Sequence, residues 1–344
     1  WVFLKAKKHP AGGLYVRNAA QPLTWTSQGL LIPCVVRMRE TLWLYNHGIE
    51  RWLEIGDPYE DEGEEEVPSA SEVPQHCCLS LLCATRNVCL VDRSSPSEPS
   101  MLWMYHFVSE HWMSLTQQQI IPVGMVVSAT EVVAPRRVPI NIFTPGDPAR
   151  IVGIVGYIHG GPHSAITSCF SPAVAFYVAC GCAVVVMSYT GSIGLLEEDL
   201  LSLPGHIGSW DVEDCYLALE KARMQLEDAS GKKSLPVALL GGSHGGFLGA
   251  HLIGQYPTAF VAACLRNPVI NIASMVDSTD IPDWTYHNVD SALSACGHNV
   301  MDGEARQRMW ECSPLRYTEN VQAHVMLMIG NNDRRVPTFQ GLGY

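Results

Sequence analysis

Apolar residues in the first third of the chain occur in short runs that turn residues separate. Typical runs are GLLIPCVVRM at 29–38, TLWLYN at 41–46 and MLWMYHFV at 101–108. Short apolar runs at regular spacing indicate antiparallel β-structure, either a sandwich or propeller blades. The sequence shows no clear internal repeat, so this pattern leaves both architectures open.

The pattern changes after about Pro122, where apolar runs of strand length begin to alternate with helical periodicity. Such alternation predicts a parallel sheet covered on both faces, because the crossover helices must pack against it. We therefore predict an α/β domain over residues 123–344, preceded by an all-β domain over residues 1–122. The expected elements are strands at 138–145 and 151–158, buried strands at 237–240 and 325–330, a helix at 210–226, and a helix from the GGSHGG turn to Tyr256.

One apolar stretch, PAVAFYVACGCAVVVMSY at 172–189, has the length of a membrane helix. Gly181 divides it into a helix-like half and a valine-rich half of strand length. Each half alone is too short to span a bilayer. We therefore predict a buried helix followed by a buried strand, and no membrane segment.

Composition narrows the class of protein. Of the 344 residues, 47% are hydrophobic and 16% are charged, which is typical of a packed globular chain. The net charge of −12 argues against nucleic-acid binding. The acidic run at 60–66 is interpreted as a solvated loop. The twelve cysteines form no C-x-x-C pair, which favours reduced thiols in an intracellular protein. Because the chain opens at Trp1 without a starting Met, we expect a fragment.

Residues 240–249, LGGSHGGFLG, contain a G-x-S-x-G motif centred on Ser243. The motif follows a predicted strand and opens a predicted helix, which is the context of a nucleophile elbow. Glycines at 241 and 245 fit a turn so tight that larger side chains would collide with the serine. A glycine-rich turn without chemistry is the alternative. A phosphate loop is disfavoured because no G-K-[ST] ending follows.

An oxyanion hole is expected from HGGP at 159–162, directly after an earlier apolar strand. The backbone N–H groups of Gly161 and of His244, the residue after the nucleophile, are the candidate donors. An ordinary Gly-Pro turn is the alternative.

Asp333 follows the last apolar strand and is placed like a triad acid that orients a histidine. A surface acid paired with a neighbouring arginine is the alternative.

A general base is missing from this pattern. The chain order expected of such a site is serine, acid, histidine, yet no histidine follows Asp333. The earlier histidines nearest the motifs (His159, His163, His244, His251 and His324) are expected to be structural. Without a base, only residual catalysis from the oxyanion hole and binding would remain, so we expect the chain as given to be inactive.

Several segments together resemble the prolyl oligopeptidase family of serine peptidases, and within it the acylaminoacyl-peptidases. The segments are HGGPHS, LSLPG, LLGGSHGGF, HLIGQYP, RNPVINIAS, STDIPDW and DRRVP. The resemblance runs through most of residues 150–344, and the pair RNPVINIAS and STDIPDW is its most specific part. Over the first ~120 residues it is loose and rests on the β-rich pattern.

The resemblance implies an α/β-hydrolase domain capped by a seven-bladed propeller that restricts access to short peptides. Such enzymes release an N-acylated residue, for example N-acetylalanine, from a blocked N-terminus. They are cytosolic, are often homo-oligomers and need no metal or organic cofactor. The resemblance assigns Ser243 as nucleophile, Asp333 as acid, and Gly161 and His244 as oxyanion donors. It places the catalytic histidine beyond Tyr344.

The chain departs from the family at two points. The family usually has Tyr-Arg-Gly-Ser where this chain has YTGS at 189–192, so Thr190 replaces an arginine expected to pair with an acid. Residues 1–122 suffice for about three blades of roughly 40 residues each, which is a partial propeller.

Two alternatives stay open from the sequence. One is a catalytically silent paralogue that binds blocked peptides, which the missing histidine and Thr190 favour. The other is a general serine esterase, which the bare motifs permit. A histidine encoded downstream would argue against the first, and a preference for acetyl-amino-acid amides over simple esters would argue against the second.

Overall fold

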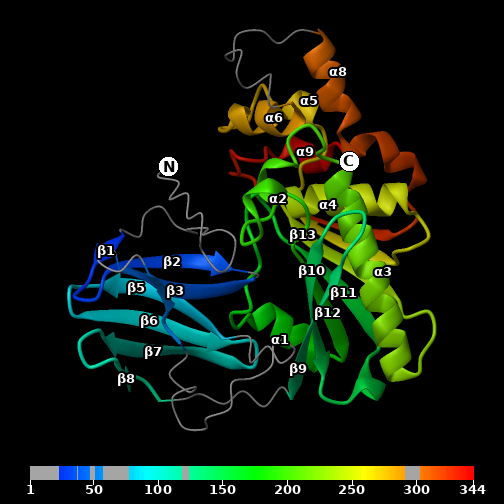
Figure 1. Ribbon diagram of the computed structural model, residues 1–344. Coiled ribbons are helices and arrows are strands. Elements are labelled where there is room, and N and C mark those ends of the chain that lie inside the picture. The colour runs from blue at the N-terminus through cyan, green and yellow to red at the C-terminus, as the bar shows by residue number, and fades with distance from the viewer. Residues whose placement is uncertain (1–22, 37, 47–50, 57–76, 118–123, 291–302) are drawn as a thin grey trace. The chain divides into compact units, whose positions relative to one another are not determined.

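The computed structural model describes most of the chain, and its ribbon is shown in Figure 1. The described residues are 23–36, 38–46, 51–56, 77–117, 124–290 and 303–344. They belong to two compact units, the first joining residues 1–127 with 167–176 and 194–196, and the second comprising the rest. The domain boundary expected after residue 122 and the acidic run at 60–66 both lie outside the described residues, so they stay predictions.

The first unit contains two four-stranded antiparallel sheets. One sheet has the order β1 (Thr24–Trp25), β2 (Leu30–Val36), β3 (Arg39–Asn46) and β4 (Arg51–Glu54). The other has the order β5 (Cys78–Ala84), β6 (Val88–Ser95), β7 (Glu98–His106) and β8 (His111–Ser114). In each sheet neighbouring strands follow one another in the chain, as in a propeller blade. The described apolar runs, at 30–36, 41–46 and 101–106, therefore form the antiparallel strands that their spacing predicted.

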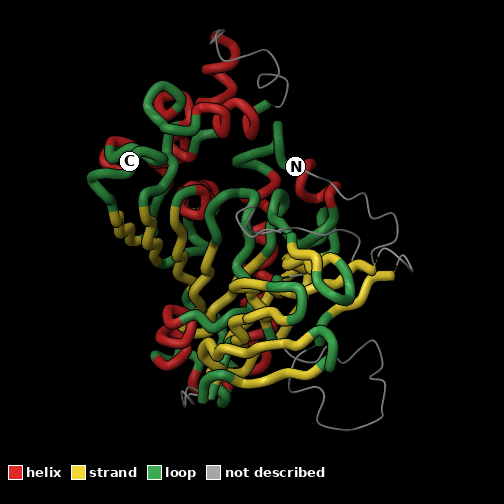
Figure 2. The backbone as a smooth tube through the Cα atoms, turned by 90° about the vertical axis from the view of Figure 1, so that its left-hand side faces the viewer, coloured by secondary structure: helices red, strands yellow, loops and turns green. Residues whose placement is uncertain are grey.

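The second unit is built on a seven-stranded sheet with the order β15–β14–β13–β11–β12–β10–β9. Its strands are β9 (Met125–Val132), β10 (Val138–Pro145), β11 (Gly153–Ile158), β12 (Cys182–Met187), β13 (Val237–Gly242), β14 (Ala262–Arg266) and β15 (His324–Met328). The five strands β11 to β15 are mutually parallel, and β10 pairs antiparallel with β12. They appear as yellow segments in Figure 2. The predicted α/β-hydrolase class is confirmed.

Helices connect these strands. They are α1 (Pro172–Ala179), α2 (Glu197–Leu201), α3 (Trp210–Ser230), α4 (His244–Gln255), α5 (Ile272–Met275), α6 (Pro282–Val289), α8 (Gly303–Glu311) and α9 (Phe339–Leu342), with 3₁₀ turns η1 (Pro148–Arg150) and η2 (Pro314–Asn320). The stretch at 172–189 forms α1 and then the buried strand β12, divided at Gly181 as predicted, where φ is 88°. The prediction that the helix is buried is wrong, because only one side of α1 is covered and Phe176 is 64% exposed. Among the described helices, none is both long enough and apolar enough to cross a membrane.

The prediction that the strand at 325–330 is buried is wrong. A strand does form there, but β15 is the edge of the sheet, and Val325, Met326 and Met328 are 38%, 61% and 45% exposed. An apolar run of this length indicates a strand without showing whether neighbours cover it.

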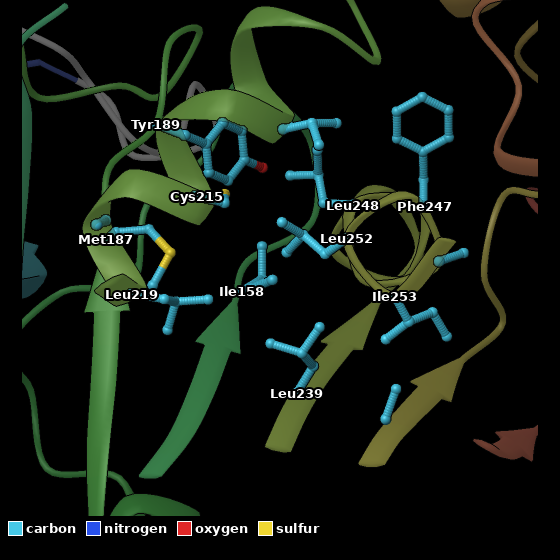
Figure 3. Packing of buried hydrophobic residues seen from close by; sticks show 14 of the residues in the cluster. Ile158, Met187, Tyr189, Cys215, Leu219, Leu239, Phe247, Leu248, Leu252 and Ile253 are labelled. Atoms are coloured by element: carbon cyan, nitrogen blue, oxygen red, sulfur yellow. The ribbon is translucent and has the colours of Figure 1, made fainter. Parts of the chain in front are cut away.

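Two helices that carry site residues pack side by side against the sheet. In Figure 3, Leu219 of α3 and Leu252 of α4 lie beside Leu239 of β13 and Ile158 of β11. A side chain at Gly156 of β11 would collide with Leu219, so the glycine lets α3 approach the strand closely. The packing of this apolar layer fixes the distance between the N-terminus of α4 and the sheet.

Truncating Leu219 tests how much the layer contributes. The side chain is 1% exposed, so Leu219→Ala leaves a cavity and should lower the free energy of unfolding by about 2–5 kcal/mol in urea titrations. Met224→Ala on the same helix is the matched control, because Met224 is 66% exposed and its loss should cost less than about 0.5 kcal/mol. Equal effects of the two changes would contradict this account of the core.

Candidate active site at the carboxyl edge of the sheet

The segments singled out from the sequence leave the sheet at one edge. The HGGP loop follows β11, Ser243 follows β13, and Asp333 lies shortly after β15. Because these strands are parallel, their carboxyl ends share an edge, which is where open α/β sheets bind ligands.

Ser243 occupies a strained strand-to-helix turn. Its φ of 56° and ψ of −120° lie where non-glycine residues are rarely found, and the side chain is partly exposed. The Ser243 N–H donates to the Arg266 carbonyl at 2.9 Å, and the Ser243 carbonyl accepts from Phe247 N–H at 3.0 Å. The turn is therefore held by β14 on one side and by the first turn of α4 on the other.

The glycines on either side of Ser243 leave room for close backbone packing. A Cβ at Gly241 would collide with the Gly245 carbonyl, and a Cβ at Gly245 would collide with the carbonyl oxygen of Ile158 in β11. The geometry is that of the predicted nucleophile elbow.

The HGGP loop lies directly against this elbow. A Cβ added at Gly160 would be 3.4 Å from the Cβ of Ser243 and 3.0 Å from the Gly242 oxygen. Gly161 has φ of 128°, in the region that favours glycine, and its backbone is exposed. The structure thus brings the candidate oxyanion loop and the candidate nucleophile together.

His159 holds the peptide between the two loop glycines. Burial lowers the pKa of His159 to about 4, so the ring is neutral near pH 7. Its Nδ1–H donates to the Gly160 carbonyl at 2.8 Å, and its Nε2 accepts from the Ser192 hydroxyl at 2.9 Å. The Gly160–Gly161 peptide is trans, so the Gly161 N–H points away from the carbonyl that His159 holds.

The backbone N–H and the side chain of His244 have different roles. As the first residue of α4 it has an N–H without a partner inside the helix, which is available to a substrate oxygen. Its side chain is fully buried, with Nε2 3.0 Å from Oδ2 of Asp211. Oδ1 of Asp211 accepts from the N–H groups of Gly208 and Val212 at 2.8 and 3.0 Å. The imidazole is therefore structural, as expected.

Asp333 is partly exposed in the loop after β15. Its Oδ1 accepts from the N–H groups of Arg335 and Val336 at 2.9 and 3.0 Å, and among the described residues its Oδ2 has no hydrogen-bond partner. The Arg335 guanidinium binds Asp280 instead, at 2.8 and 3.2 Å. One carboxylate oxygen is therefore positioned by the loop, and the other is available to orient a histidine.

No histidine in the described part of the chain forms a hydrogen bond with the Ser243 hydroxyl. His251 is buried, with Nε2 donating to the Cys312 carbonyl at 3.0 Å and Nδ1 accepting from the Gln255 amide at 2.8 Å. Burial lowers its pKa to about 4. His163 donates from Nδ1 to the Gly191 carbonyl at 2.9 Å. These histidines have structural partners, and the described residues supply no base.

Thr190 has a partner that the sequence did not indicate. Its N–H and hydroxyl donate to Oδ2 of Asp214 at 2.9 and 2.5 Å, while Arg136 donates from Nε to Oδ1 at 2.8 Å. Burial raises the pKa of Asp214, although the bonds from Thr190 and Arg136 act in the opposite direction. The arginine that pairs with this buried acid comes from the loop between β9 and β10, 54 positions away from Thr190 in the chain.

Trp284 is a second residue that sequence reasoning missed. In the sequence it is distinguished only as part of STDIPDW, yet its indole N–H donates to the Gly161 carbonyl at 2.8 Å. Its ring also meets the ring of His244 edge-on, with centroids 5.8 Å apart. No local pattern connects a tryptophan on α6 with a glycine 123 positions earlier.

Comparison with known proteins agrees with this geometry. The sequence model of the prolyl oligopeptidase family matches residues 168–344. Acylamino-acid-releasing enzymes from Sus scrofa, Homo sapiens and Arabidopsis thaliana are 44%, 42% and 41% identical over 186, 206 and 192 residues. These matches cover 54%, 59% and 56% of this chain, but the chain spans only about a quarter of those relatives, 25%, 27% and 24%.

Solved structures share the fold over nearly the whole chain. An acylaminoacyl peptidase from Pyrococcus horikoshii aligns with a TM-score of 0.72 at 16% identity, covering 91% of this chain and 46% of that one. A puromycin-hydrolyzing peptidase from Mycobacterium tuberculosis aligns with a TM-score of 0.70 at 21% identity, covering 93% and 46%. At these identities the likeness establishes the fold alone.

The glycine at 245 provides a stability test of the elbow. Gly245→Ala would force a Cβ against the Ile158 carbonyl, so it should lower the free energy of unfolding by about 1–3 kcal/mol in urea titrations. Gly303→Ala at the start of α8 is the control, because its Cβ would meet open space and the change should be neutral or stabilise by less than about 1 kcal/mol. A neutral Gly245→Ala would contradict the close approach of α4 to β11.

Buried His251 gives a pH test. Burial lowers the pKa of folded His251 to about 4, whereas a histidine in the unfolded chain has a pKa of about 6.5, so the unfolded state binds more protons between these values. The free energy of unfolding should therefore fall as the pH decreases from about 6.5 to about 4, by roughly 2 kcal/mol from this residue between pH 7 and pH 5. His251→Gln should flatten the slope in urea titrations at the two pH values, whereas His324→Gln at an exposed position should not. An unchanged slope in His251→Gln would refute the assignment.

Proposed function

This chain belongs to the prolyl oligopeptidase family, and from that membership we propose that it carries the catalytic part of a serine exopeptidase. The enzyme releases an N-acylated amino acid, such as N-acetylalanine, from the blocked N-terminus of a short peptide. The observation that carries the proposal is the strained Ser243 turn with the HGGP loop packed against it. The names of the relatives, acylamino-acid-releasing enzymes at 41–44% identity, support the substrate class.

Each site residue has a defined part in the proposed reaction. A histidine oriented by Asp333 removes the proton from Ser243 Oγ, which attacks the carbonyl carbon of the acylated residue. The N–H groups of Gly161 and His244 stabilise the oxyanion. The carbon–nitrogen bond then breaks, the peptide amine leaves with the proton from the histidine, and water hydrolyses the acyl-enzyme. The described residues do not supply that histidine, so we propose that a longer form of the protein does.

The partner and location assignments follow the same family reasoning. We propose that the complete protein is a cytoplasmic homo-oligomer whose antiparallel sheets belong to a propeller that admits only short peptides. The described cysteines of both units form no disulfide bonds with one another, which is compatible with a reducing compartment. The resemblance on which the site rests implies neither metal nor organic cofactor.

A silent peptide-binding paralogue remains the second candidate, because no described histidine reaches Ser243. The Thr190 substitution no longer favours it, since Thr190 is hydrogen-bonded to Asp214 and that carboxylate also has Arg136 as a partner. The geometry of the site does not distinguish a general esterase from the proposed exopeptidase. Their substrate preferences do.

Fluorophosphonate labelling tests the proposal, because the probe reacts with an activated serine. The chain alone should label slowly, since loss of the base costs about 10⁴–10⁶ in rate. A version continued to the end of its natural reading frame should label rapidly, and Ser243→Ala in that version should abolish labelling. Gel fluorescence and mass spectrometry of the labelled peptide identify the site.

The other outcomes decide between the candidates. A folded, continued version that stays unlabelled would favour the silent paralogue. If it labels, hydrolysis of N-acetylalanine 4-nitroanilide should be preferred over 4-nitrophenyl acetate. The reverse preference would favour the esterase.

A further inference from the structure

We propose that Trp284 is a positioning residue that sets the direction of both oxyanion donors. The inference rests on the proposed function, because it assigns a role in the same reaction. Trp284 touches no reacting atom in this argument. It acts through the two residues whose N–H groups would bind the substrate oxygen, and it reaches them from α6, a separate element.

The first contact restrains Gly161. A glycine explores a wide range of backbone angles, so its N–H direction must be imposed by its surroundings. The carbonyl before it, on Gly160, accepts from His159, and its own carbonyl accepts from the Trp284 indole at 2.8 Å. Both peptide planes that flank Gly161 are therefore held by side chains, one by His159 within the loop and the other by Trp284 from α6. Together they determine where the Gly161 N–H points.

The second contact reaches the other donor. The edge of the indole meets the His244 ring with an interplanar angle of 68° and a centroid separation of 5.8 Å, a favourable aromatic arrangement. The Nε2 atom of the same imidazole is 3.0 Å from Oδ2 of Asp211. A carboxylate and an indole thus both restrain the His244 side chain, and its backbone N–H is restrained with it.

Trp284 is itself held against the loop that carries the acid. Its backbone N–H donates to the Ile281 carbonyl at 3.1 Å. Just before α6, Thr279 donates its hydroxyl to the Arg335 carbonyl at 2.7 Å, and the Asp280 carboxylate binds the Arg335 guanidinium. Arg335 in turn donates its N–H to Asp333. The segment 279–284 therefore links the acid loop to both oxyanion donors. It connects the loops that follow β11, β13 and β15, so the three groups of the site are held in fixed positions relative to one another.

A positioning role predicts a particular kinetic signature. Oxyanion contacts strengthen as charge develops in the transition state, so a misdirected donor lowers kcat more than it changes substrate affinity. Removing only the Trp284 N–H should reduce kcat about tenfold, as expected for one weakened hydrogen bond, while KM stays within about twofold. A role limited to folding would change the amount of active protein and the melting temperature instead.

The experiment uses the protein continued to the end of its natural reading frame, with N-acetylalanine 4-nitroanilide as substrate. Trp284→Phe keeps a ring beside His244 and removes the donor. A second variant carries 3-benzothienylalanine at position 284, which has the shape of indole but no N–H, so packing loss cannot explain its effect. Trp310→Phe on α8 is the matched control, because the Trp310 side chain is 36% exposed and lies outside the site.

Support requires that both Trp284 variants lose kcat at near-constant KM and label more slowly with fluorophosphonate, while Trp310→Phe behaves as wild type. If Trp284→Phe does not fold, the isostere decides alone. Unchanged kcat in the isostere, or a raised KM with unchanged kcat, overturns the positioning role while leaving the proposed function intact. A wild-type protein that neither labels nor hydrolyses the anilide overturns both.

Discussion

The close approach of the α4 N-terminus to the end of β11 is the constraint on which the site depends. No side chain fits at Gly245 between the helix and the Ile158 carbonyl, and none fits at Gly241 beneath the turn. This contact forces Ser243 into backbone angles that a serine rarely adopts, and it also places the HGGP loop beside the serine. The strain is maintained by the apolar layer of α3 and α4, because a loosely packed helix would relax away from the strand.

Beneath the turn lies a set of buried polar groups whose positions depend on one another. Asp211 binds His244, His159 binds the loop carbonyl and Ser192, and Asp214 is shared by Thr190 and Arg136. Buried groups of this kind stabilise one arrangement strongly, because each loses its partner in any other. Burial lowers the pKa of His159 to about 4, so this ring stays neutral near pH 7 and serves as a fixed hydrogen-bond bridge.

The Thr190 substitution shows how such a network tolerates change. A carboxylate buried at Asp214 requires cationic or polar partners, wherever in the chain they come from. Here the hydroxyl of Thr190 and the guanidinium of Arg136 share the two oxygens. A difference from a family motif therefore does not by itself indicate an inactive site. The buried carboxylate needs a cationic or polar partner, but that partner can come from more than one position in the chain.

By itself, the sequence determined the features that arise from neighbours in the chain. Apolar periodicity predicted the strands and helices of the α/β unit, and the glycines around Ser243 predicted a strained elbow, since both depend on a few consecutive residues. The sequence also placed each candidate site segment directly after a predicted strand. Which groups meet across the edge of the sheet was decided only by the tertiary structure: Arg136 on Asp214, Trp284 on Gly161, and the exposure of β15. These contacts join residues far apart in the chain, and they follow from how helices and strands pack, a property that no local pattern encodes.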